Sequence, residues 1–198
     1  MPSSIGHTIA GAAVAWLIDL IPGDRQWRIA PRGPAWYAQA GGGVTVTCIA
    51  LAAAPDLDLL FHTHRTATHS LSAALAVGGV AALMARLFRR PVARLAIMCL
   101  AAYGSHMALD WMAVDRIVPY GIQLLWPFDE RWTISGWNVF AQTERHRLTT
   151  LVVLRQNAAA VAREIAILLP VAVVVWRVRV KALAGLSTKL PGGDHSSQ

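Results

Sequence analysis

The sequence has little charge for its length. Only 15% of its 198 residues are Asp, Glu, Lys or Arg, whereas 55% are hydrophobic and the mean hydropathy is +0.44. Soluble domains contain about 25% charged residues, so this chain has too little charge to cover an ordinary aqueous surface. We therefore expect much of its surface to face lipid, with a soluble all-α core of similar apolar runs as the alternative.

Cysteine is also scarce. The two cysteines, Cys48 and Cys99, lie inside apolar runs, and no CxxC pair occurs. This spacing excludes a zinc site made of thiolates and indicates two buried, inert thiols. The N-terminus lacks the basic region that begins a secretory signal peptide. We therefore expect the first apolar run, which carries His7 and Asp19, to be retained.

The charge that is present is mostly positive, with a formal net charge of +7 and a pI of about 10.4. Such a balance can indicate nucleic-acid binding. Here the basic residues stand in short clusters beside apolar runs, as the positive-inside rule describes for membrane proteins. We therefore expect no nucleic-acid partner. The clusters contain Arg86, Arg89, Arg90 and Arg94, and then Arg177, Arg179 and Lys181.

Apolar residues are concentrated in segments rich in Ala and Gly, which suits close helix packing in a bilayer. Each segment approaches the length of about 20 residues that a membrane span requires. We predict an all-α integral-membrane bundle of about five helices in the lipid bilayer. A single domain is expected over residues 1–185, followed by a disordered tail at 186–198. The five segments cover approximately residues 5–21, 41–60, 70–88, 94–112 and 158–176.

The basic clusters predict a topology in which the N-terminus and the loops at 61–69 and 113–157 lie outside. Residues 130–157 within the last loop are expected to form an interfacial helix or a lid, and Trp111 and Trp126 to anchor at the interface. This topology places imidazoles and carboxylates from four segments in one layer. Charged groups in or near a membrane are costly and usually mark a site.

The strongest local motif is the pair His106 and Asp110. These residues are four apart on a predicted helix, so they share one face and can bind the same metal ion. A His–Asp hydrogen bond inside a core explains the pair equally well. In Pro55-Asp56-Leu57-Asp58, two carboxylates end an apolar run, and Pro55 can turn Asp56 inward. Taken alone, this second motif is explained better by a solvent-exposed acidic turn than by a ligand role.

The third motif, at residues 62–70, contains three histidines and an arginine. His69 is predicted to begin a helix that Thr66 or Thr68 caps, with His64 and Arg65 beside it; a hydrophilic loop without a ligand is the alternative. His7 alone would not indicate a ligand. Together the motifs provide imidazoles and carboxylates at one membrane face. This donor set suits Zn²⁺ best, as one to three ions, with manganese or iron as alternatives.

The ordered set of motifs resembles the YdjM-like family of inner-membrane, metal-dependent hydrolases, one member of which is described as LexA-regulated. That family is thought to be distantly similar to zinc-dependent phospholipase C and related zinc nucleases. The resemblance implies a bacterial inner (plasma) membrane protein with metal ligands at His7, Asp56, His69, His106 and Asp110. It rests on Gly6-His7, Pro55-Asp56-Leu57-Asp58, His64-Arg65, Thr68-His69-Ser70, Gly104-Ser105-His106 with Asp110, and Gly121 followed by Leu124-Leu125-Trp126-Pro127-Phe128.

Two stretches depart from the family pattern. Residues 62–68 lack a Gly-aromatic pair before Thr-His-Ser, and residues 111–115 lack the usual Thr-Pro-x-Gly turn. We therefore expect the pocket wall and the substrate to differ. Further zinc ligands of the phospholipases have no convincing counterpart, and His146 and Glu164 are the candidates that remain.

We predict a metal-dependent hydrolase in which a metal-activated water attacks a phosphoester or lipid-headgroup substrate at the outer face. Asp58 is expected to act as a general base or to orient a ligand histidine. Arg65 and His64 are expected to hold an anionic phosphate. The alternatives are a non-catalytic metal-binding or metal-transporting membrane protein, and a scaffold without metal. Transport sites usually lie near the bilayer midplane, which disfavours the transporter.

Overall fold

A computed structural model describes residues 1–21, 23, 35–61, 65–144 and 149–187. The described residues form helices and no strand, although two isolated bridges join Ala113 to Phe140 and Ile122 to Thr133. The predicted all-α class is therefore confirmed. In chain order the elements are α1 (Ser4–Asp19), α3 (Ala35–Ala40), α4 (Gly42–Ala53), the 3₁₀ helices η1 (Ala54–Phe61) and η2 (Ala67–His69), α5 (Leu71–Leu87), α6 (Val92–Trp111) and α7 (Leu151–Ser187).

Each predicted apolar segment lies on a helix, but the helices differ in length. Three helical stretches of the described chain are long and apolar enough to cross a membrane: Gly42–Leu59, Val92–Trp111 and Leu151–Leu183. The apolar α5 is shorter. The 16 residues of α1 extend about 24 Å at a rise of 1.5 Å per residue, against about 30 Å for a hydrocarbon core. Of the approximately five predicted membrane spans, three are therefore supported by the length and composition of the helices.

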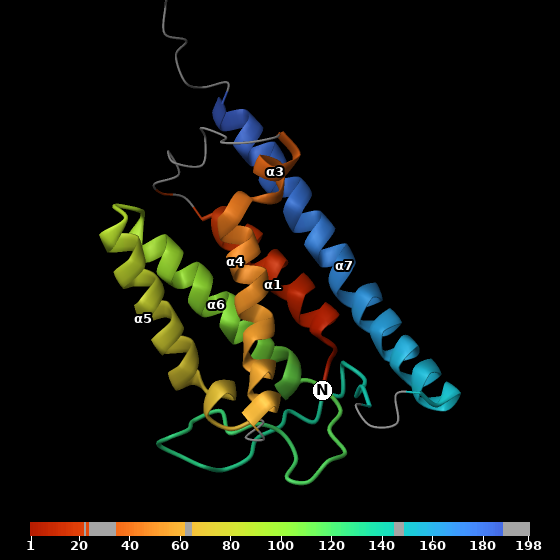
Figure 1. Ribbon diagram of the computed structural model, residues 1–198. Helices are drawn as coiled ribbons and strands as arrows, with labels where there is room; N and C mark the ends of the chain where they lie inside the picture. The colour runs from red at the N-terminus through yellow and green to blue at the C-terminus, as the bar shows by residue number, and fades with distance from the viewer. Residues whose placement is uncertain (22, 24–34, 62–64, 145–148, 188–198) are drawn as a thin grey trace, which may run out of the picture.

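Helices α1 and α6 form the centre of the bundle. Helix α1 packs against α4, α6 and α7, and α6 also packs against α4 and α5, so α5 and α7 lie on opposite flanks (Figure 1). Small residues allow these helices to approach closely. At Gly11, for example, a Cβ atom would lie 2.5 Å from the Cβ of Ala52 in α4. The free thiols of Cys48 and Cys99 are buried in this interior, as predicted.

The two ends of the bundle differ in construction. The loop between α6 and α7 lies at one end, together with the start of α1, the helices η1 and η2 and the end of α6 (Figure 1). The α5–α6 turn and the end of α7 lie at the other. Residues 130–144 form no helix, whereas residues 151–157 begin α7; the prediction of an interfacial helix over 130–157 is therefore wrong for its first part, and the lid stays a prediction. Helix α7 continues to Ser187, two residues into the predicted tail; the remainder of that tail, with His195, lies outside the described residues.

Candidate metal centre

The centre of the site is the predicted pair on α6. His106 and Asp110 lie on one face of the helix, with His106 Nε2 3.2 Å from Asp110 Oδ2. The other ring nitrogen, Nδ1 of His106, lies 2.7 Å from the carbonyl oxygen of Ala52 in α4. Because a carbonyl can only accept a hydrogen bond, this contact keeps the proton on Nδ1 and leaves the lone pair of Nε2 directed toward the site.

His69 is oriented in the same way by a carboxylate. Its Nδ1 lies 3.2 Å from Asp58 Oδ2, and its Nε2 lies 3.1 Å from His106 Nε2 and 3.4 Å from Asp110 Oδ2. Asp58 Oδ2 also accepts hydrogen bonds from the backbone N–H of Arg65 and the hydroxyl of Thr68. A carboxylate that holds the distal nitrogen of a ligand histidine is a common outer partner in metal sites. Of the two predicted roles of Asp58, the geometry favours the orienting one.

The predicted start of the helix at His69 is wrong. His69 ends η2, and α5 begins at Leu71. Ser70 is the N-cap, because its backbone is extended and its hydroxyl accepts the N–H of Ala73. The hydroxyl of Thr68, predicted as a possible cap, instead contacts Asp58 and His69. Helix α5 therefore begins two residues later than predicted. The His69 imidazole lies outside the helix, where it can turn toward α6.

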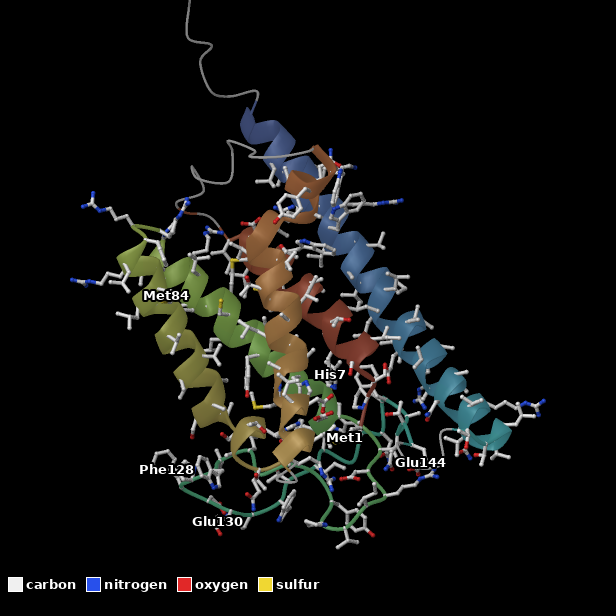
Figure 2. The ribbon with its side chains drawn as sticks, in the orientation of Figure 1. Met1, His7, Met84, Phe128, Glu130 and Glu144 are labelled. Carbon is white, nitrogen blue, oxygen red and sulfur yellow. The ribbon has the colours of Figure 1, made fainter. Side chains whose placement is uncertain are left out.

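His7 and Asp56 complete the cluster from two other elements. His7, near the start of α1, stacks on His106 with ring centres 3.6 Å apart, and its Nε2 lies 3.5 Å from Asp110 Oδ1. Asp56 lies in η1, which begins where Pro55 interrupts the α-helical backbone, and its Oδ1 lies 3.7 Å from His106 Nε2. Figure 2 shows His7 at the end of the bundle that carries the α6–α7 loop.

The arrangement fits a metal ion by three observations. Two groups, His7–Asp56–His106 and His69–His106–Asp110, each place their ligand atoms within 4.8 Å of one another. The Nε2 and carboxylate oxygen pairs lie 3.2–3.7 Å apart, close to the edge of about 3.3 Å of a tetrahedron with zinc bonds of 2.0–2.1 Å. The Nε2 lone pairs of His69 and His106 face each other, an arrangement that a cation or a proton between them stabilises.

Buried polar atoms in the site lack ordinary hydrogen bonds. Within the described residues, both ring nitrogens of His7 and both carboxylate oxygens of Asp110 are buried with no hydrogen-bond partner. Such atoms are rare in folded proteins and call for an explanation, of which a bound ion is one. The five predicted ligands therefore come together as a donor set that can hold a metal; their role as ligands stays a prediction.

Without a metal, His69 binds a proton tightly. Burial of the ring opposes its charged form, but the contacts with Asp110 and Asp58 outweigh burial and raise the pKa of His69 to about 9. A divalent cation would replace this proton.

Arg65 connects the site to the α6–α7 loop. Its φ of +69° is left-handed, which directs its backbone N–H to Asp58 while the guanidinium pairs with Asp115. Asp115 Oδ2 also accepts the N–H of Gly121, 2.7 Å away. The prediction that Arg65 holds a phosphate stays a prediction, and it requires the guanidinium to share its pairing with Asp115. His64, its predicted companion, lies outside the described residues.

The family comparison covers this whole arrangement. The sequence model of the YdjM inner membrane protein family matches residues 1–184, a range that contains every residue of the cluster. The chain belongs to this family. No curated protein and no solved structure matches the chain. Membership of the YdjM family makes the chain a membrane protein, as its composition predicts, while the side to which the metal centre faces stays a prediction.

Of the two additional candidate ligands in this YdjM-family protein, Glu164 has a different structural role. Its carboxylate, fully buried on α7, accepts the N–H of Ser3 at 2.9 Å and the hydroxyl of the same residue. Ser3 is the N-cap of α1, four residues before His7. Glu164 therefore holds the start of the helix that carries His7. His146, the other candidate, lies outside the described residues.

A buried ion pair at the opposite end was missed by the sequence analysis. Arg179 of α7 donates to Asp19 of α1 at 2.6 Å, and both side chains are buried. Arg94 donates to the carbonyls of Ile18 and Ile21 at the end of α1. In the sequence these arginines indicate only basic clusters beside apolar runs. The signal that could have revealed the pair is Asp19, an isolated carboxylate in an apolar run.

Proposed function

We propose that this YdjM-family protein is a membrane-embedded, metal-dependent hydrolase that acts on a phosphoester, with lipid headgroups as the substrate class. The single observation that supports the proposal most is the convergence of three imidazoles and two carboxylates from α1, η1, η2 and α6 on one small volume. Zinc accepts such a mixed nitrogen and oxygen donor set, and manganese and iron are the alternatives. A distant similarity to zinc-dependent phospholipases C would agree with this chemistry.

The bound metal would supply a Lewis acid that activates water and polarises the phosphoryl oxygen. The protein residues have separate tasks in this proposal. Asp58 and the carbonyl of Ala52 fix the rings of His69 and His106 through their Nδ1 atoms, so that both Nε2 atoms would be available to hold a metal. Asp56 has the most exposed side chain of the five candidate ligands, at 12%, which makes it the ligand closest to an entering substrate.

The position of the site favours a substrate at the membrane surface. The cluster lies at the end of the bundle that carries the α6–α7 loop, where Figure 2 shows His7, whereas transport sites usually lie near the midplane on broken helices. Arg65, beside the cluster, offers a guanidinium for a phosphate oxygen. These features support hydrolysis at the interface over metal transport.

The test begins with metal analysis of the detergent-purified protein, followed by hydrolysis assays with a nitrophenyl phosphodiester and with phospholipids in mixed micelles. We expect bound zinc, activity lost with a chelator and restored by the metal, and loss of both metal and activity in His106→Ala. Ser105→Ala is the matched control, since the Ser105 hydroxyl donates only to the carbonyl of Ala102 in its own helix. Stoichiometric metal in His106→Ala would refute its ligand role. Bound metal without hydrolysis, combined with metal flux into vesicles, would replace the hydrolase by a transporter.

A further inference from the structure

An apolar groove runs along the flank of the bundle between α4 and α5. Both helices pack against α6, but in the described part of the chain they share no comparable interface with each other. The groove between them has a volume of about 520 Å³, and α6 forms its floor through Leu95 and Cys99. It is separate from the metal centre. Met84, which lines it, lies on α5 toward the end of the bundle away from His7 (Figure 2).

The dimensions of the groove suit a hydrocarbon chain. Its lining on α5 and the following C-cap extends from Ala76 to Phe88, about 18 Å at 1.5 Å per residue, slightly more than one leaflet of a hydrocarbon core of about 30 Å. A groove of this length with an apolar lining fits an extended acyl chain, and a helix of a second copy is the other occupant that the experiment distinguishes.

The chemistry of the groove is apolar except at one end. Its sides are formed by residues such as Leu51, Val77 and Val80, and its one charged lining residue is Arg90. Arg90 follows α5 at the turn that also exposes Arg86 and Arg89. This lining favours an occupant that combines an apolar chain with a net negative headgroup at the arginine end.

We propose that this groove binds one acyl chain of an anionic phospholipid, whose phosphate is held by Arg90. The headgroup then lies at the end of the bundle opposite the metal centre, so this lipid is a bound partner and not the substrate. The proposal depends on the groove and its charged end, and it does not depend on hydrolase activity.

Native mass spectrometry of the detergent-purified protein, titrated with phosphatidylglycerol or phosphatidylcholine, tests the proposal. We expect one phosphatidylglycerol to bind more tightly than any further lipid and more tightly than phosphatidylcholine. Arg90→Gln removes the charged partner of the phosphate and should weaken this binding about tenfold, the loss expected for one charge-assisted contact. Ala81→Trp places an indole in the groove and should abolish the tight site.

Two matched variants separate the groove from general surface effects. Arg86→Gln removes the same charge from the same turn, but Arg86 does not line the groove. Leu83→Trp adds the same indole to α5 at a position that is 57% exposed and also outside the lining. Both should bind phosphatidylglycerol like the wild type. The proposal would be overturned by equal losses of binding in Arg86→Gln and Arg90→Gln, or by unchanged binding in a folded Ala81→Trp protein. It would also be overturned by a dimer that Ala81→Trp dissociates without any change in lipid binding.

Discussion

At the scale of single residues, the carboxylate of Asp58 is held by donors that include three described neighbours. The backbone N–H of Arg65, the hydroxyl of Thr68 and the Nδ1–H of His69 all converge on its Oδ2 atom. A carboxylate so engaged is stabilised in its charged form and is poorly placed to take a proton from water. Its main effect is to fix the tautomer and the direction of the His69 ring.

This role predicts the behaviour of an Asp58→Asn variant. We expect the variant to fold and to bind zinc about 10- to 100-fold more weakly, the usual cost of losing an outer partner of a ligand histidine. Competition with a chromophoric chelator measures the affinity. Asp129→Asn serves as the control, because Asp129 pairs only locally with the exposed Arg131. Unchanged zinc affinity in Asp58→Asn would show that the contact with His69 does not orient a ligand.

The proton on His69 gives a pH dependence with a definite sign. In the metal-free protein the pKa of His69 is raised from 6.5 to about 9, so its contribution to stability is complete below pH 6.5 and is lost as the pH rises through 9. Metal must displace this proton, so zinc affinity should rise up to about tenfold per pH unit between pH 7 and 9. Chelator competition and thermal unfolding of the metal-free protein across this range measure both trends. Zinc affinity independent of pH would contradict the assignment.

At the scale of elements, helix α1 is held by contacts with α7 at both of its ends. At its start, Ser3 donates twice to Glu164 of α7, and the close approach depends on Gly6, where a Cβ would lie 2.6 Å from Glu164 Oε2. His7 follows directly. The register between α1 and α7 therefore determines where one of the candidate ligands lies.

Removing this contact should affect stability and the metal centre together. Glu164→Ala leaves the Ser3 donors without their partner and should cost about 1–3 kcal/mol. Gly6→Ala should cost a similar amount through steric conflict. Both variants should weaken zinc binding through displacement of His7. Gly79→Ala is the control, since a Cβ there has no neighbour within 4 Å and Ala favours the helix. Thermal unfolding and zinc titration in detergent measure the effects. A loss of stability with full zinc affinity would show that Glu164 does not position His7.

At the scale of the whole molecule, the two ends of the bundle are stabilised by different chemistry. One end gathers the donor set for a metal, and the other closes α1 against α7 through the buried pair of Asp19 and Arg179. Removing one partner of a buried ion pair leaves the other charge poorly compensated, although Arg94 Nη1 lies 3.6 Å from Asp19 Oδ1, whereas replacing both with apolar residues is often tolerated.

This contrast predicts the outcome of a double-mutant experiment. Asp19→Leu and Arg179→Met, each alone, should lower the free energy of unfolding by about 3–5 kcal/mol. The double variant should recover most of that loss, while zinc affinity remains at the wild-type level because the pair lies at the far end of the bundle. Thermal unfolding in the same detergent gives the comparison. Additive losses in the double variant would show that the two side chains do not stabilise each other.

Much of the site could be predicted because it depends on local spacing and depth. His106 and Asp110 share a face through the helical repeat, Pro55 interrupts the backbone before Asp56, and hydropathy placed His7 and His69 at the same level. The predicted start of α5 lies two residues before the observed start, because Ser70 competes as a cap with the threonines before it.

The sequence by itself determined the helical class, the membrane environment and the layer in which imidazoles and carboxylates meet, because these follow from periodicity and hydropathy along the chain. The tertiary structure decided the partners: Asp58 with His69, Arg65 with Asp115, Ser3 with Glu164 and Asp19 with Arg179. Hydropathy gives the depth of a residue in a bundle but not the rotation of its helix or the identity of its neighbour. Those are set by packing between segments as far as 161 residues apart.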